Sequence, residues 1–336
     1  MNKKTMKTNL FKSLLLMVLA CLSLVSCKKD EPENPLLFDA AYMQGLWNVY
    51  EDAAYGKKDL NVYFRFTSDG KSESYEKSNS DKYTYRTGSF VIENKWLRLT
   101  HKTSRHFHTI EGVDRYVADF KGSEAYWFVE SYYLDTVMNN DIRIKVNGTT
   151  LYMRKVNDLP AYWKTEYSET EMAASATNIL GQWDLCDRFT IKGSNYNYSY
   201  TYNPATQGMI LKENGVLNNF NFWANQVWNR ENNAGRVASD QNVRLQNADC
   251  AWILNGKKLT LTCASYIILS YDADKNISGQ ERVTPDEPIQ MDYQIYTYTS
   301  KWMILYSVWD NTYYAFRKAA QTSSAPRKMV ISSPDK

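Results

Sequence analysis

The chain has 336 residues and carries 40 lysines and arginines against 37 aspartates and glutamates. Four of the lysines and none of the acids come before residue 27, so the rest of the chain, with 36 basic and 37 acidic groups, is close to neutral. This balance excludes a nucleic-acid-binding protein that works through a large basic surface. The 26 tyrosines, 10 tryptophans and 12 phenylalanines favour β structure.

The first 26 residues have the form of an export signal peptide. A basic head with four lysines is followed by an apolar run over 14–24, which is too short to span a bilayer. The segment Leu24-Val25-Ser26-Cys27 resembles the bacterial lipobox. This resemblance implies that residues 1–26 are removed, that the thiol of Cys27 is lipidated, and that the acyl chains hold the protein to a membrane.

Residues 27–37 form a charged tether after the signal peptide. The four residues that follow the cysteine, Lys28-Lys29-Asp30-Glu31, resemble the sorting tag of Bacteroidetes surface lipoproteins. That resemblance implies a lipid-anchored protein of the outer membrane, displayed on the cell surface.

Four patterns occur twice along the remaining chain, in the same order. The matched segments are 45–47 with 181–183, 64–70 with 210–215, 90–100 with 252–262, and 151–155 with 314–318. Four matches in one order predict tandem domains of one type. We place these domains at 38–156 and 165–320, with a linker over 156–168 between them and a loose tail over 321–336.

Apolar and polar residues alternate within each repeat, which indicates strands with one buried face. The clearest case is the segment 142–146, which is followed by Asn147-Gly148 and a return strand over 149–155. Both turn residues tolerate a positive φ, so this segment predicts a β-hairpin. Helical signals are sparse. Residues 39–44 predict a short turn, and the capping-box spacing of Ser168 and Glu171 predicts a helix over 169–179.

Many short antiparallel strands in a domain of this length have to form a sandwich or a barrel, because an open sheet leaves its edges unpaired. A short turn, then Gly-x-Trp, then up-and-down strands that end with a basic residue, is similar to the lipocalin-like domains of bacterial lipoproteins. The resemblance implies an all-β chain of two tandem up-and-down antiparallel β-barrels, with a short helix before each. It also implies structural pairs of Trp47 with Arg154 and of Trp183 with Arg317.

The three histidines, His101, His106 and His108, all lie in the first repeat. His106 and His108 share a face of a predicted strand, and His101 could complete a set of metal ligands. We favour an exposed strand face instead. The segment 272–279, around Asp272 and Asp274, is similar to a calcium loop but lacks its glycine and glutamate, so we interpret it as a polar loop. We therefore expect no metal and no cofactor.

Three cysteines follow the tether, namely Cys186, Cys250 and Cys263. Cys250 and Cys263 flank a strand-turn-strand pattern around Asn255-Gly256, which would place them directly opposite each other. A disulfide in an oxidising compartment and a pair of buried free thiols are both compatible with this arrangement.

Two aromatic segments in the second repeat are candidates for a ligand site. Tyr196, Tyr198 and Tyr200 alternate with polar residues and would line one face of a strand, whereas Trp223 and Trp228 lie among amide side chains. Flat rings beside polar groups suit a sugar ring or an apolar ligand. The alternative is that these rings fill the interior or the contact between the two barrels.

These features favour a non-catalytic binding lipoprotein that captures a small apolar or amphipathic ligand at a barrel mouth or in the cleft between barrels. Two alternatives remain. One is a glycan-binding surface lipoprotein with an exposed strip of Trp and Tyr, and the other is a structural or assembly protein that contacts another surface protein. The sequence contains no known catalytic signature, and it predicts neither the ligand nor the oligomeric state.

Overall fold

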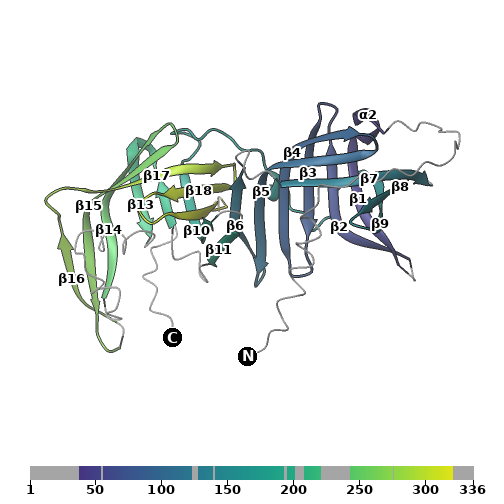
Figure 1. The fold of residues 1–336 in the computed structure, drawn as a ribbon. Helices are drawn as coiled ribbons and strands as arrows, with labels where there is room; N and C mark the ends of the chain where they lie inside the picture. Colours follow the sequence, from purple (N-terminus) through teal and green to yellow (C-terminus); the bar gives the residue numbers. More distant parts are fainter. Residues whose placement is uncertain are drawn as a thin grey trace, which may run out of the picture. The chain divides into compact units, whose positions relative to one another are not determined.

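A computed structural model describes residues 38–53, 56–122, 128–138, 141–192, 195–200, 208–220, 243–274 and 276–320 (Figure 1). The described chain divides into two compact units. The first contains the residues up to Glu111 together with Asp119–Tyr167, and the second contains Gly112–Ala118 together with the residues from Ser168 onward. Each unit is built around a closed antiparallel sheet, so the predicted fold class of two tandem β-barrels is confirmed.

The first barrel is a ring of eight strands in the order β4-β3-β2-β1-β9-β8-β7-β5, and it closes because β5 also pairs with β4. Its elements are α2 (Ala40–Met43), β1 (Gly45–Ala53), β2 (Gly56–Phe66), β3 (Lys71–Lys77), β4 (Lys82–Glu93), β5 (Trp96–Ile110), β7 (Phe128–Met138), β8 (Asp141–Val146) and β9 (Thr149–Val156). A further strand, β6 (Val113–Lys121), belongs to the same sheet but lies outside the ring.

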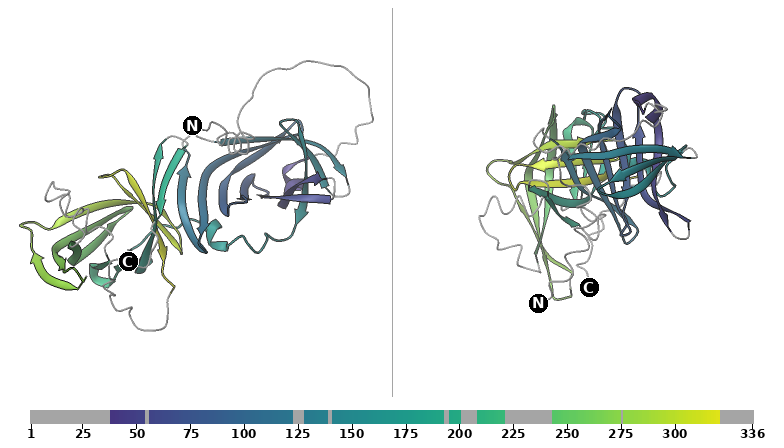
Figure 2. Two further views of the ribbon diagram at one scale, coloured as in Figure 1. Left: turned by 90° about the horizontal axis from the view of Figure 1, so that it is seen from below. Right: turned by 45° about the vertical axis from the view of Figure 1, so that its right-hand side comes forward.

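The second barrel is a ring of eight strands in the order β10-β12-β13-β14-β15-β17-β18-β19, closed by the pairing of β19 with β10. Figure 2 shows the strands of each unit curving around an interior. β11 and β16 lie outside the ring and pair with β10 and β15. The strands are β10 (Gly181–Lys192), β11 (Asn195–Tyr200), β12 (Gly208–Leu211), β13 (Val216–Phe220), β14 (Val243–Asn255), β15 (Lys258–Tyr271), β16 (Ile277–Val283), β17 (Ile289–Tyr298), β18 (Trp302–Ser307) and β19 (Thr312–Lys318), with 3-10 turns η3 (Thr165–Ser168) and η5 (Glu213–Gly215).

The two rings have the same strand order, so that positions in one barrel can be matched to positions in the other. The hairpin β4–β5 turns at Asn94-Lys95 and the hairpin β14–β15 turns at Gly256-Lys257. Asn94 and Gly256 both have a positive φ, 51° and 58°, as such tight turns require. Counting outward from these turns gives, for each residue on the neighbouring strands of one barrel, the structurally equivalent residue of the other barrel, which we call its twin.

The predicted hairpin at Asn147-Gly148 is also confirmed. These residues have φ values of 47° and 81°, and they connect β8 to β9. Ile142 pairs with Met153, and the side chains of both are fully buried. The alternation of apolar residues therefore fixes which face of the hairpin points into the barrel.

Each barrel begins with a turn that closes one end through a tryptophan. Trp47 Nε1 donates a hydrogen bond of 2.7 Å to the carbonyl of Met43, and Trp183 Nε1 donates one of 2.8 Å to the carbonyl of Ile179. Both indoles are buried. In the first barrel the turn is the helix α2, which has Asp39 as its N-cap.

The helix predicted over 169–179 is wrong. Outside η3, this segment is irregular and ends in a single turn over 176–179. Glu171, the acid of the expected capping box, accepts a 3.3 Å hydrogen bond from Thr297 instead, and the nearby Glu169 accepts one of 2.8 Å from Ser300. Because these carboxylates are held by β17 and the turn after it, they do not cap a helix.

The basic residue over each tryptophan is a lysine, one position after the arginine that the sequence suggested. Strand register places Lys155 opposite Trp47 and Lys318 opposite Trp183, with their Nζ atoms 5.7 and 5.2 Å from the ring centroids. Arg154 instead forms hydrogen bonds of 2.7 and 2.8 Å with Asp141. The guanidinium of Arg317 lies 5.5 Å from the Trp302 ring. The expected pairs are therefore wrong by one residue, because neighbouring residues of a strand point to opposite faces.

The segment after β9, expected to be a linker, packs on the outer face of the first barrel. Trp163 lies edge-on to Tyr75 at 5.1 Å, and Tyr167 stacks on Phe107 at 4.3 Å between ring centroids. Trp163 and Tyr167 are both buried. The first unit therefore extends to Tyr167 rather than ending at residue 156.

Substituting Trp47→Phe or Trp183→Phe should lower the free energy of unfolding of its barrel by about 2 kcal/mol, because a buried carbonyl loses its hydrogen-bond donor. Urea denaturation monitored by circular dichroism measures the change. Trp96→Phe is the matched control, since Trp96 is 41% exposed. Equal stability of the buried and control variants would contradict the role given to the two indoles.

Candidate functional site

The interior of the first barrel contains polar side chains where the second barrel has apolar or less polar ones. Counted from the matching hairpins, His101 of β5 corresponds to Cys263 of β15. Glu130 of β7 pairs with Leu99, whereas its twin in the second barrel is Met291, which pairs with Leu261. The second ring closes without these polar groups, so barrel closure does not require them in the first ring. They are therefore candidates for function.

A third difference lies on β3. Ser72 pairs with Gly88 of β4, and the equivalent residue in the second barrel is Leu217, which pairs with Cys250 of β14. Ser72 and Leu217 are both buried. The hydroxymethyl group of serine fills less space than the leucine side chain, so the first barrel is less completely filled by apolar atoms at this level.

Gly88 is required by the close approach of β4 and β5. A Cβ atom at this position would lie 1.9 Å from the carbonyl oxygen of Thr100. Gly88 pairs with His101, and the strand register shifts between Thr87 and Gly88. The shift changes the alternation, so that His101 joins His106 and His108 on the inner face. The expectation that the histidines form an exposed strand face is therefore wrong, since His101 is only 3% exposed.

His101, Glu130 and Tyr132 form the buried end of the polar region. Nε2 of His101 lies 3.4 Å from Oε1 of Glu130, a distance of ion-pair range but without the geometry of a hydrogen bond. Tyr132 donates a 2.7 Å hydrogen bond to Oε2 of Glu130. The imidazole of His101 also stacks on Phe128, with 5.8 Å between ring centroids. The carboxylate of Glu130 is thus held between a phenol and an imidazole.

Arg86 and Glu76 form a second pair, nearer to solvent. Nη1 of Arg86 lies 3.2 Å from Oε2 of Glu76, and their side chains are 17% and 40% exposed. The guanidinium also lies 5.7 Å from the centroid of Phe128, on which His101 stacks. Both pairs therefore contact the ring of Phe128, the Glu76 pair through Arg86 and the Glu130 pair through His101.

The charges of these groups shift their pKa values. Burial by itself would raise the pKa of Glu130, but His101, Arg86 and Tyr132 outweigh burial and lower it, so Glu130 is ionised at neutral pH. Burial, and then the charge of Arg86, lower the pKa of His106. His106 is therefore neutral at pH 7, with Ser104 Oγ 2.9 Å from its Nε2.

Several buried polar atoms of this region have no hydrogen-bond partner among the described residues. They are the hydroxyls of Ser72 and Ser74 and both ring nitrogens of His101. Buried polar groups nearly always have a partner, from the protein, from water or from a ligand. The hydroxyls of Ser72 and Ser74 and Nδ1 of His101 therefore present unused donors and acceptors inside the barrel, next to the charges of Arg86 and Glu130, whereas Nε2 of His101 faces the Glu130 carboxylate.

The predicted ligand residues of the second repeat are not brought together in the described part of the chain. Tyr196, Tyr198 and Tyr200 occupy alternate positions of β11, outside the ring, and Tyr198 is half-buried. Trp223 and Trp228 lie outside the described residues. A ligand site on these five residues stays a prediction.

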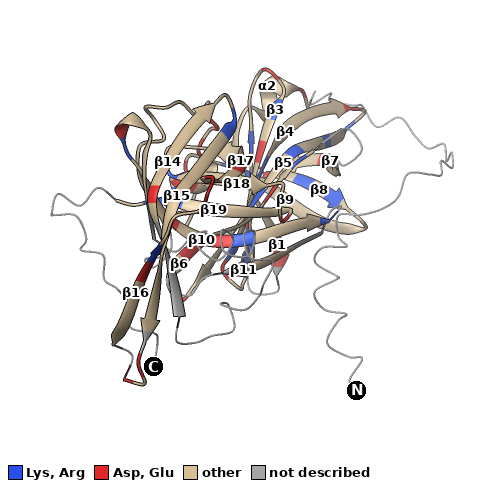
Figure 3. Ribbon diagram, turned by 90° about the vertical axis from the view of Figure 1, so that its left-hand side faces the viewer, with Lys and Arg blue, Asp and Glu red and all other residues tan. Residues whose placement is uncertain are grey.

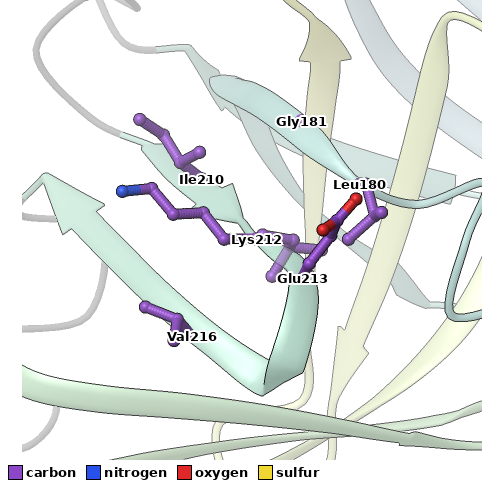
Figure 4. A pocket seen from close by; sticks show the side chains of 7 residues that line it. Leu180, Gly181, Ile210, Lys212, Glu213 and Val216 are labelled. Atoms are coloured by element: carbon purple, nitrogen blue, oxygen red, sulfur yellow. The ribbon is translucent and has the colours of Figure 1, made fainter.

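A surface depression adjoins the Gly-x-Trp strand of each barrel. In the second barrel it is lined by Leu180, Gly181, Ile210, Lys212 and other residues (Figure 4). The first barrel has a depression at the corresponding place, lined by residues that include Gly45 and Lys155. Because both repeats have this feature, it follows from the shared fold and does not distinguish a binding site.

The other properties of the described chain add no second site. Lys and Arg are interspersed with Asp and Glu over the strands (Figure 3). Within the described ranges, no three His, Cys, Asp or Glu side chains are grouped as metal ligands, and no helix is long and apolar enough to cross a membrane. The side chain of Asp272 accepts a 2.8 Å hydrogen bond from the backbone N–H of Asn276.

No known family model and no curated protein matches the chain.

The lowered pKa of His106 predicts a loss of stability in acid. Above a pH of about 6.5, this histidine is neutral in both the folded and the unfolded chain. Below that pH the unfolded chain takes up a proton that folded His106 does not, so the free energy of unfolding decreases. The contribution of His106 is measured as the difference between the wild type and His106→Gln in how the free energy of unfolding changes with pH, in urea denaturation between pH 8 and pH 5.

His106→Gln should reduce the decrease in the free energy of unfolding between pH 8 and pH 5, because glutamine keeps hydrogen-bonding groups but does not titrate. His108→Gln is the comparison, since His108 is less enclosed and its pKa is lowered in the same direction by burial and Lys82. An unchanged decrease in the His106→Gln variant would show that His106 is not the group that titrates.

Proposed function

We propose that the chain is a non-catalytic binding lipoprotein, tethered through Cys27, that takes a small amphipathic ligand into the polar part of the first barrel. One observation carries the proposal: two barrels of the same topology differ at buried positions, where His101, Glu130 and Ser72 correspond to Cys263, Met291 and Leu217. Buried ionic groups contribute little to stability, so their presence in one barrel favours a binding role.

The arrangement suits a ligand with one polar end and one flat apolar part. Arg86 and the hydroxyls of Ser72 and Ser74 can donate hydrogen bonds to a carboxylate, sulfonate or hydroxyl group. Phe128, which already contacts both Arg86 and His101, offers a ring face for the apolar part. A few convergent polar groups beside aromatic surface are typical of small-molecule sites.

The geometry favours binding over nucleophilic catalysis. A serine nucleophile has to lie within hydrogen-bond distance of the base that activates it. Among the described residues, neither ring nitrogen of His101 forms a hydrogen bond, and the hydroxyls of Ser72 and Ser74 have no partner. Ser72 and Ser74 therefore have no histidine base among the described residues. Ser104 Oγ does lie 2.9 Å from Nε2 of His106, but burial and the charge of Arg86 lower the pKa of that imidazole, which makes it a weak base.

Binding can be tested with anilinonaphthalene sulfonate, an anionic probe with an aromatic body, by isothermal titration calorimetry. We expect one saturable site, and Arg86→Gln should weaken the affinity about tenfold, because a charge-assisted hydrogen bond is lost. Arg98→Gln is the matched control, since Arg98 is also on a strand of the first barrel but is 52% exposed.

A variant with Ser72→Leu, His101→Cys and Glu130→Met copies the second barrel at three buried positions. It should fold, as judged by circular dichroism, and should no longer bind the probe. Binding that is unchanged in this variant and in Arg86→Gln would overturn the proposed site.

The tether is tested separately. Cys27→Ser removes the thiol that the lipobox resemblance marks for acylation, so most of the protein should move from the membrane fraction to the soluble fraction of the cell. Immunoblotting of the two fractions measures the distribution. Continued membrane association of the variant would contradict a lipid anchor at Cys27.

A further inference from the structure

Cys250 and Cys263 lie directly opposite each other on neighbouring strands of the second barrel. Cys250 of β14 pairs with Cys263 of β15. Two residues along the ladder, on the same face of the sheet, Trp252 pairs with Leu261. Both thiols lie close to one carbonyl oxygen, that of Ala248, with Sγ–O distances of 3.4 Å for Cys250 and 3.6 Å for Cys263. The two sulfur atoms therefore share one face and one small region of space.

The spacing of opposed strand residues is close to what a disulfide needs. Directly opposed residues of an antiparallel pair have Cβ atoms about 4.5–5.5 Å apart. A disulfide requires a Cβ–Cβ distance of about 3.5–4.5 Å, so closing the bond takes a small local movement. Both cysteines are free thiols in the described structure.

We propose that Cys250 and Cys263 form an intrachain disulfide that fastens β14 to β15. The reaction needs an oxidant, which we take to be a small-molecule or protein disulfide. The thiolate of Cys250, the more exposed of the two, attacks one sulfur of that disulfide and displaces its other sulfur as a thiol. The thiolate of Cys263 then attacks the Cys250 sulfur and displaces the second thiol. Two cysteines lose two protons and two electrons, and the oxidant disulfide is reduced to two thiols.

The bond would act where β15 changes partner. Residues Lys258–Cys263 of β15 pair with β17 of the ring, and residues Tyr266–Tyr271 pair with β16, outside the ring. Cys263 is thus the last ring-paired residue before the β14–β15 ladder continues past the barrel. A covalent link at this position ties the extension to the closed sheet and limits fraying of the ladder.

Cys186 provides a matched control in the same barrel. It is buried, and its thiol lies 3.6 Å from the carbonyl oxygen of Asp184. It lies at a register shift between Leu185 and Asp187 where β10 pairs with β19, and no cysteine of β19 is opposed to it. It is therefore not expected to join a bridge.

The full chain, first reduced and then incubated with oxidised glutathione, tests the proposal independently of cellular location. After alkylation of the remaining thiols, peptide mapping without reduction should give a cross-linked peptide pair that contains Cys250 and Cys263. Cys186→Ser should give the same product, and Cys250→Ser should not. Reduction should lower the thermal midpoint of the wild type and of Cys186→Ser by on the order of 5 °C, and should leave Cys250→Ser unchanged.

Two results would overturn the proposal. One is complete alkylation of both Cys250 and Cys263 after oxidation. The other is glutathionylation of Cys250 without the internal bridge, which would show that the strands cannot bring the sulfurs together. The wild-type peptide map decides between these outcomes even if a variant fails to fold.

Discussion

Ring closure is the constraint on which the rest of this protein depends. In each repeat the last strand pairs with the first, β9 with β1 and β19 with β10, so the ring has no unpaired edge. Closure divides the residues of every ring strand into an inner and an outer set, and the inner set has to fill a space of nearly fixed width. Trp47 and Trp183, each bonded to the carbonyl of the preceding turn, close one end of that space.

The duplication makes it possible to separate what the fold requires from what it does not. Leu97, Leu99 and Phe90 have apolar twins in Leu259, Leu261 and Trp252, so this level of the interior is packed in both barrels. Two residues beyond Leu99 and Leu261, the first barrel has His101 where the second has Cys263. Opposite Leu99 and Leu261 themselves, the first barrel has Glu130 where the second has Met291. Burying an imidazole and a carboxylate costs desolvation energy that the apolar twin avoids, and for this reason the first interior is the better candidate for recognition.

Part of this site could be found in the sequence and part could not. The repeat was visible, but the matched segments ended at Thr100 and Thr262, one residue before His101 and Cys263. A comparison extended by that one position would have contrasted a histidine with a cysteine. Arg86 and Glu130 gave no such signal, because they are far apart in the sequence and meet His101 and Phe128 only through the pairing of β4, β5 and β7.

Alternation of apolar residues and the turn residues Asn147-Gly148 determined from the sequence alone that the chain forms antiparallel hairpins, and the repeat determined that it does so twice. The tertiary structure decided what depends on register: which basic residue lies over each tryptophan, and on which face His101 points. A shift of one residue moves a side chain to the opposite face of a strand, and such shifts, like the one beside Gly88, arise from contacts between strands that local sequence patterns do not encode.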